Sequence, residues 1–150
     1  GGQKMKINIR TDSSISETEI CITCNQLTPE IEKLISLVRI MDMKITGEKN
    51  GHIHILDISE ILYIDTVDKK TFLYTKTEVY ESSLRLYELE AQLEGTEFFR
   101  ANKSCIVNFK QIKSLKSDID GRILITMSNG EKLYVSRQYA PYVKKKLGVR

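Results

Sequence analysis

Residues 52–75 read HIHILDISEILYIDTVDKKTFLYT, and this stretch decides the fold class. Its apolar and polar residues alternate with a period of two, which is typical of half-buried β-strands and not of helices. The pattern predicts two short strands with a kink near residues 57–59 and a charged hairpin turn at residues 68–70. We therefore expect the main body to be built from antiparallel strands.

The C-terminal half continues the same pattern. Asn129-Gly130 between two apolar runs is the strongest short hairpin signal that a sequence can carry. Helical spacing predicts short helices at residues 83–95, with Tyr87 among the residues facing inward, and at residues 139–147. We expect a mainly β, elongated antiparallel sheet or sandwich domain with short helices. A strand pair or one long bent strand is predicted at 71–82, and further strands at 104–109, 111–115, 122–127 and 132–136.

Residues 1–46 are predicted to form a small extension of two strands and a helix. The strands are expected at 5–10 and 19–24, where apolar residues alternate. Thr28 can cap a helix that starts at Pro29, and the apolar residues that follow recur at helical spacing. We expect this extension to pack on the main domain or to mediate self-association.

The polar residues 47–51, with two glycines, are the predicted boundary, so the main domain is expected to span 47–150. A chain of 150 residues fits one domain with a short extension. The sequence has no apolar run long enough to cross a membrane and no apolar segment typical of a signal peptide, which predicts a cytoplasmic protein.

The charge of the chain is unevenly distributed. Residues 1–96 carry 11 lysines and arginines against 16 acidic residues, whereas residues 97–150 carry 12 against 4. A basic C-terminal third favours a polyanionic partner such as a nucleic acid. The alternatives are a protein-interaction module that docks an acidic partner and a basic surface that only aids solubility.

No pattern in the sequence predicts catalysis or a cofactor. The chain has no glycine-rich phosphate loop, nucleophile elbow or zinc-protease motif. Cys21 and Cys24 with His52 and His54 make a nominal metal set. On a strand, however, residues i and i+3 point to opposite faces, so the two thiols would not converge. With Cys105 the three cysteines are too few for a disulfide framework.

Three segments at predicted strand ends carry side chains that suit DNA. Lysine and arginine pair with phosphates or guanine, whereas asparagine and glutamine match adenine. Each segment could instead be an ordinary solvated turn, loop or basic tail. The candidates are Lys69, Lys70 and Thr71 in the first segment, Arg100, Asn102, Lys103 and Ser104 in the second, and Arg137 and Gln138 in the third.

Two other modes of nucleic-acid binding fit the sequence less well. A helix-turn-helix needs two adjacent helices, and neither helix of the predicted main domain has a helical neighbour. RNA binding on a sheet face needs exposed aromatic residues for stacking. Tyr74, Tyr80 and Tyr134 could serve, but burial on an apolar face explains them as well.

Three blocks of the chain resemble the LytTR family of bacterial DNA-binding domains. They are ILYIDTVDKKTFLYT at 61–75, FFRANKSCIVNFKQIKSL at 98–115 and GEKLYVSRQYAPYVKKKLG at 130–148. The resemblance extends over about residues 44–148. It implies a mostly β transcription regulator that inserts loops into successive major grooves of promoter DNA, usually at paired repeats.

The resemblance also carries expectations about site residues and partners. It places base or phosphate contacts at Lys70 or Thr71, at Asn102, Lys103 and Ser104, and at Arg137 and Gln138. Lys69 and Arg100 are phosphate candidates because of their charge. Many family members have histidine where Thr71 and Asn102 stand, which predicts different preferred bases here. Too few residues precede the match for a receiver domain, so the chain resembles the stand-alone members. Such members imply a homodimer at least on DNA, and in some cases a small membrane protein that restrains the regulator.

Overall fold

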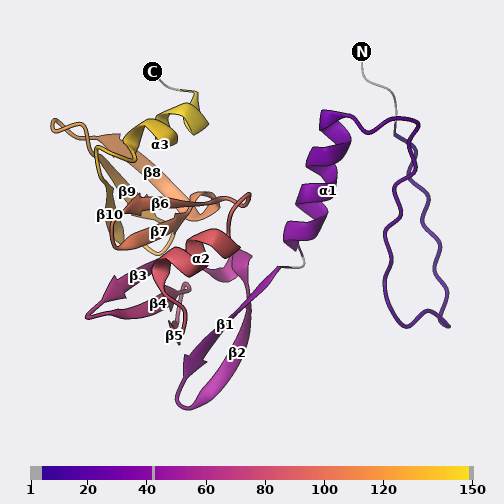
Figure 1. Ribbon diagram of the computed structural model, residues 1–150, viewed down its shortest axis with the longest axis horizontal. Coiled ribbons are helices and arrows are strands. Elements are labelled where there is room, and N and C mark those ends of the chain that lie inside the picture. The colour runs from indigo at the N-terminus through magenta and orange to yellow at the C-terminus, as the bar shows by residue number, and fades with distance from the viewer. Residues whose placement is uncertain (1–4, 42, 149–150) are drawn as a thin grey trace.

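The computed structural model describes residues 5–41 and 43–148, and its main body consists largely of β-strands (Figure 1). The strands are β1 (Lys44–Lys49), β2 (His52–Asp57), β3 (Tyr63–Val67), β4 (Lys70–Tyr74), β5 (Val79–Ser82), β6 (Phe98–Asn102), β7 (Cys105–Asn108), β8 (Ile112–Ser117), β9 (Ile123–Met127) and β10 (Lys132–Val135). The α-helices are α1 (Pro29–Met41), α2 (Leu86–Gln92) and α3 (Ala140–Leu147). These elements confirm the predicted mainly β class.

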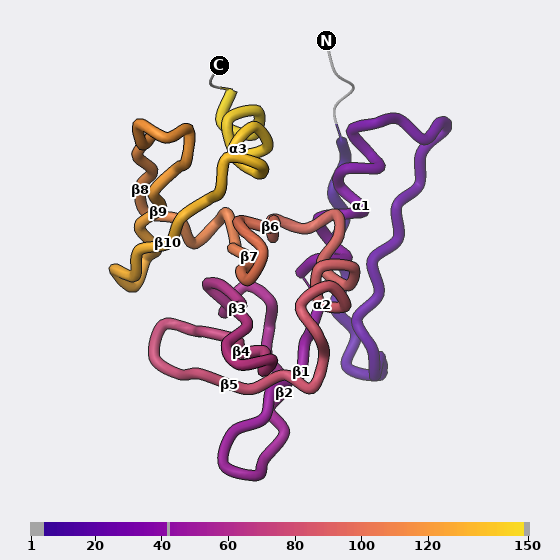
Figure 2. The backbone as a smooth tube through the Cα atoms, turned by 60° about the vertical axis from the view of Figure 1, so that its left-hand side comes forward, coloured from indigo at the N-terminus to yellow at the C-terminus, as the bar shows by residue number. Residues whose placement is uncertain are grey.

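The strands form two antiparallel sheets. The seven-stranded sheet has the order β2-β1-β5-β4-β3-β7-β6, and the three-stranded sheet has the order β10-β9-β8. In both backbone views the three-stranded sheet and α3 lie at one end of the body, and the β1–β2 hairpin projects at the other (Figures 1 and 2). The domain is therefore elongated, as the sequence predicted.

Alternation along the central strands fills two cores on opposite faces of the large sheet. Tyr63 of β3 packs with Val107 of β7 and Ile125 of β9 in the core that faces the small sheet and α3. The next residue of β3, Ile64, packs in the other core, which α2 closes with Leu89. Because both faces of β3 and β7 are covered, these two strands form the rigid centre of the domain.

The turns follow the chemistry that the sequence indicated. Gly130 has φ +89° in the hairpin between β9 and β10, a value that glycine adopts without strain. Asp68 and Lys69 have φ of 51° and 65° in the hairpin between β3 and β4. Two successive positive φ values match the twist of the strands that such a turn joins. The predicted kink after residue 57 is a short 3₁₀ turn, Ile58–Glu60.

The structure differs from the sequence predictions at three places in the main body. Residues 98–102, which were not among the predicted strands, form β6. Residues 47–51, predicted as the domain boundary, form the end of β1 and its turn into β2. A Cβ on Gly47 would lie 2.6 Å from the Cβ of Tyr80, so this glycine lets β5 approach β1. Tyr87, expected to face inward, is 65% exposed on α2.

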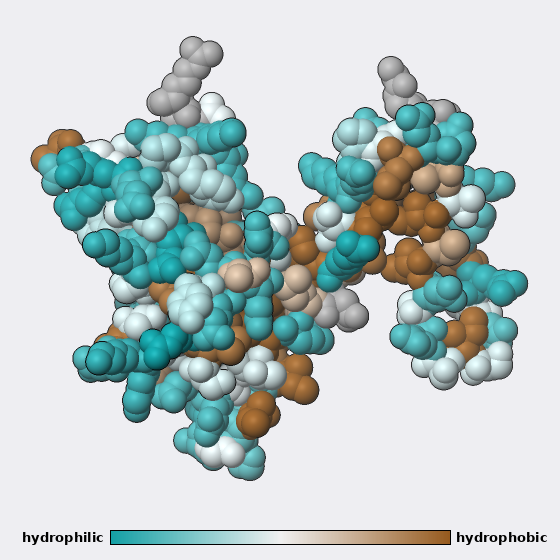
Figure 3. Space-filling model, viewed as in Figure 1, coloured by the Kyte–Doolittle hydropathy of each residue, from teal (hydrophilic) through white to brown (hydrophobic). Residues whose placement is uncertain are grey.

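The N-terminal extension contains the predicted helix but not the predicted strands. Thr28 accepts a hydrogen bond at Oγ1 from the backbone N–H of Ile31 (3.3 Å), which caps α1 as expected. Residues 5–27 form no strand, and all of them are exposed. Thr28, just before α1, is half-buried. Without a partner strand their alternating apolar residues have no sheet to complete. Figure 3 shows apolar surface along α1, beside the main body.

Candidate nucleic-acid interface

The structure brings the three predicted segments together at one edge of the molecule. We name them the tip (residues 68–70, between β3 and β4), the turn (residues 103–104, between β6 and β7) and the connection (residues 136–139, between β10 and α3). Together they form the three-loop edge, toward which the arrowheads of β3 and β6 both point in Figure 1.

Sheet pairing places the tip beside the turn. Asp65 of β3 lies opposite Cys105 of β7 in antiparallel register, so the end of β3 meets the beginning of β7. The backbone N–H of Thr66 donates a hydrogen bond to the carbonyl of Ser104 (2.9 Å). The tip and the turn are therefore neighbours, although about 35 residues separate them along the chain.

Two further hydrogen bonds attach the connection to the turn. Asn102 Nδ2 donates to the carbonyl of Tyr134 in β10 (2.9 Å). The backbone N–H of Ser136 donates to the carbonyl of Ala101 in β6 (2.9 Å). These bonds join the two sheets at the point where the connection leaves β10, so all three segments share one rigid support.

The tip presents two lysine side chains to solvent. Lys69 and Lys70 are exposed, and the nearest carboxylate to Lys70 Nζ is Glu81 Oε1 at 4.0 Å. A surface ion pair of this length contributes little in water, so the lysine remains available to another anion.

Thr71 does not belong to the exposed surface, contrary to the sequence prediction. Only 4% of it is exposed, and it lies between Thr66 of β3 and Ser82 of β5 in the sheet. Neighbouring residues of a strand point to opposite faces, so Lys70 and Thr71 cannot both face outward. Its side chain is covered in this structure.

Asn102 shapes the turn. Its Oδ1 accepts hydrogen bonds from the backbone N–H of Ser104 (2.9 Å) and from Ser104 Oγ (3.1 Å). A side-chain oxygen that bonds the backbone two residues further on is a common way to close a tight turn. With its amide nitrogen on Tyr134, this side chain joins the turn to β10 and leaves Lys103 exposed at the apex.

Arg100 was predicted to contact phosphate, but its guanidinium group makes hydrogen bonds within the protein. Only 14% of its side chain is exposed. Its Nε and Nη2 donate to Glu90 Oε1 of α2 (3.2 and 3.0 Å), and its Nη1 donates to the carbonyl of Lys103 (2.6 Å). All three nitrogens of the guanidinium are thus occupied by protein acceptors.

The connection presents Arg137 and Gln138, both exposed. Gly121, in the turn between β8 and β9, lies directly beneath the arginine. A Cβ on Gly121 would lie 3.2 Å from both Cγ and Cδ of Arg137, so the absence of a side chain makes room for the arginine stem. Residues 118–121 contain two aspartates and a glycine, which favour a turn, but only the fold shows that this turn packs against Arg137.

The family described as LytTr DNA-binding domain matches residues 51–148. The chain belongs to the LytTR family. A solved LytTr DNA-binding domain, from a protein of Bacillus cereus assigned as a methyl-accepting/DNA response regulator, superposes with a TM-score of 0.66 and 31% identity. That similarity covers 70% of this chain and 96% of the other. The match confirms the resemblance that the sequence blocks indicated.

Curated relatives extend the similarity over almost the whole chain. A protein of Staphylococcus aureus strain NCTC 8325, named an HTH-type transcriptional regulator, is 29% identical over 147 residues, which is 97% of this chain and 99% of the relative. Another with that type of name, from the bovine strain RF122, is 30% identical over the same length. In the described part of this LytTR protein, strands separate the α-helices from one another, so no helix-turn-helix is present there.

Behind the three-loop edge of the LytTR domain lies a group of titratable side chains that are partly or fully buried. Burial raises the pKa of Asp65, and a hydrogen bond from Tyr74 opposes this in part. Burial and the neighbouring Asp65 raise the pKa of Tyr74 to about 12, and burial raises the pKa of Cys105 to about 12. A thiol with such a pKa stays protonated at neutral pH and is a poor nucleophile.

Other chemistry considered from the sequence finds no support in the geometry. Among residues 5–41 and 43–148, no group of three or more His, Cys, Asp or Glu could hold a metal ion. No helix in that part of the chain is long and apolar enough to cross a membrane. Tyr74 is half-buried and stacks on Tyr63 with ring centroids 4.4 Å apart, so it is not free for RNA bases.

Proposed function

We propose that this LytTR protein is a transcription regulator that binds duplex DNA sequence-specifically through the three-loop edge. The observation that carries the proposal is the hydrogen-bonded convergence of three segments, from residue 68 to residue 139, at one exposed edge. The exposed candidates there are Lys69, Lys70, Lys103, Ser104, Arg137 and Gln138.

The chemistry of these side chains suits two tasks. Lys69 and Lys70 at the tip would neutralise phosphates, which supplies affinity without sequence preference. Arg137 has the donor geometry for guanine and Gln138 for adenine, and Lys103 can reach guanine or a phosphate. A narrow loop fits the major groove as an α-helix does, because only the placement of donors matters. Thr71, Asn102 and Arg100 would act by supporting the loops.

Several finer features belong to the same proposal. We place the protein in the cytoplasm as a regulator that acts by binding, without catalysis or a cofactor. Two copies would occupy paired repeats of a promoter as a homodimer at least on DNA, and the N-terminal extension (residues 1–46) would pack on the LytTR domain or join the two copies. A small membrane protein that restrains the regulator fits the stand-alone members of the family.

A selection experiment tests the proposal. The protein is used to enrich duplexes from a random-sequence library, and the enriched duplex is compared with random duplex, single-stranded RNA and an acidic protein as competitors in a gel shift. We expect a strong preference for the enriched duplex and a loss of affinity of orders of magnitude between low and physiological salt. If the acidic protein competes as effectively as the enriched duplex, the result favours the protein-interaction alternative.

A further inference from the structure

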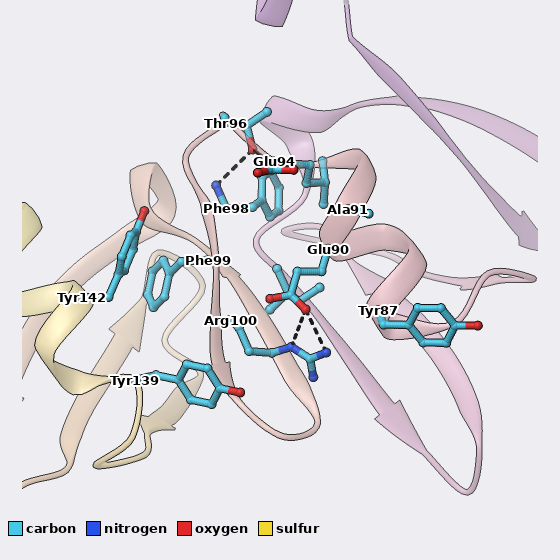
Figure 4. A pocket seen from close by; sticks show the side chains of 13 residues that line it. Tyr87, Glu90, Ala91, Glu94, Thr96, Phe98, Phe99, Arg100, Tyr139 and Tyr142 are labelled. Carbon is cyan, nitrogen blue, oxygen red and sulfur yellow. Dashed lines mark hydrogen bonds and ion pairs between the residues drawn. The ribbon is translucent and has the colours of Figure 1, made fainter.

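One ion pair outside the three-loop edge reaches it through a single hydrogen bond. Arg100 of β6 contacts Glu90 of α2 through two nitrogens and the Lys103 carbonyl through the third, as Figure 4 shows for the Glu90 side. The pair lies in a groove of about 680 Å³ bordered by α2, β6 and the aromatic residues Tyr139 and Tyr142. Because a guanidinium is planar and rigid, its bonds to Glu90 fix the direction in which Nη1 reaches the turn.

That bond is one of several that hold the turn, and it lies where the strand pairing is irregular. Between β6 and β7 the register shifts between Arg100 and Asn102, so the regular hydrogen-bond ladder is interrupted immediately before the turn. The carbonyl of Lys103 lies beyond this irregularity and accepts from Arg100 Nη1 at 2.6 Å. The position of Lys103 is thus determined by Asn102 on one side and by Arg100 on the other.

We propose that Glu90 is a positioning residue for DNA binding: it orients Arg100, and Arg100 holds the Lys103–Ser104 turn in the geometry that the DNA groove accepts. The inference rests on the proposed function of the three-loop edge. Glu90 carries a negative charge that DNA repels, so it acts through Arg100 and not by contact. Without the carboxylate the guanidinium loses two of its three protein bonds and no longer fixes the turn.

The neighbouring residue Glu94 provides a matched control. It lies four residues after Glu90, in the turn that follows α2, is exposed, and has no side-chain hydrogen bond or ion pair within the described chain. Replacing either glutamate with alanine removes the same charge, so electrostatics alone predicts equal or slightly tighter binding to every duplex. Positioning predicts a difference between them. We expect Glu90→Ala to bind the enriched duplex roughly tenfold more weakly, about the cost of one lost base contact, and random duplex no more weakly.

The experiment measures both affinities for Glu90→Ala, Glu90→Gln and Glu94→Ala, together with the backbone amide NMR signals of free protein. Glu90→Gln keeps one acceptor for Arg100 and should fall between wild type and Glu90→Ala. The amides of Lys103 and Ser104 should shift in Glu90→Ala and not in Glu94→Ala, while thermal unfolding confirms that all variants are folded.

The two proposals fail in different ways. Equal ratios of enriched to random affinity for Glu90→Ala and Glu94→Ala would overturn the positioning role while the wild type still binds specifically. A wild type that shows no preference for any duplex refutes the proposed function. That result also overturns the role of Glu90 in DNA binding, and the NMR signals then show separately whether Glu90 holds the turn: unmoved Lys103 and Ser104 amides in Glu90→Ala would mean that it does not.

Discussion

Replacing Asn102 with alanine should destabilise the protein before any DNA is added. The side chain makes three hydrogen bonds: one to the Tyr134 carbonyl and two from Ser104, at 2.9 to 3.1 Å. A hydrogen bond within a protein contributes about 0.5–1.5 kcal/mol net. Since Asn102 is half-buried and water can replace part of the loss, we expect Asn102→Ala to lower the free energy of unfolding by about 2 kcal/mol.

Urea unfolding followed by circular dichroism measures this loss. Ser104→Ala, which removes only the hydroxyl bond, should cost about 0.5–1 kcal/mol. Asn102→Asp keeps the acceptor for Ser104 and loses the donor to Tyr134, so it isolates the bond between the two sheets. The reasoning is refuted if Asn102→Ala unfolds at the wild-type urea midpoint and loses only its preference for one base pair, because Asn102 would then read DNA directly.

Three further predictions concern DNA contacts and pH. Arg137→Ala should weaken specific binding by about 1–3 kcal/mol and relax the preference at one base pair, and gel shifts giving equal losses on enriched and random duplex would reject base reading. Lys69→Ala should weaken binding to all duplexes alike and reduce the salt slope by about one, so an unchanged slope would exclude a phosphate contact. Burial raises the pKa of Asp65, so its contribution to stability is fully present below its unfolded pKa and is lost as the pH rises through the folded pKa. Asp65→Asn avoids that loss, and its gain in Tm over wild type should be larger at pH 7 than at pH 4; an equal gain at both would contradict the assignment.

The elements that sequence periodicity predicted correctly are those in which local pattern and fold agree. Apolar residues at 61–64 and 72–74 flank the charged tip, and the tip has the geometry of a tight hairpin. β6 was missed because it does not alternate: Phe98 and Phe99 are adjacent and both buried, one in each core. A strand covered on both faces carries no period-two signal. The strands predicted at 5–10 and 19–24 show the reverse case, a suitable pattern without a partner strand.

For the candidate site, too, the sequence predicted some features correctly and missed others. The sequence identified the three segments, because charged and amide residues at strand ends are recognisable without a structure. It did not separate exposed from supporting residues. Strand parity could have removed Thr71, since Lys70 beside it faces outward. No local signal could have assigned Arg100, because its partner Glu90 reaches it only after α2 packs on the sheet.

The central claim is that the tip, the turn and the connection engage DNA together. A titration of isotope-labelled protein with the enriched duplex, followed through backbone amide NMR signals, tests it most directly. We expect the largest shifts at residues 68–70, 103–104 and 136–139, all saturating with one dissociation constant. Shifts confined to one of these segments, or concentrated instead on α1 or the β1–β2 hairpin, would contradict it.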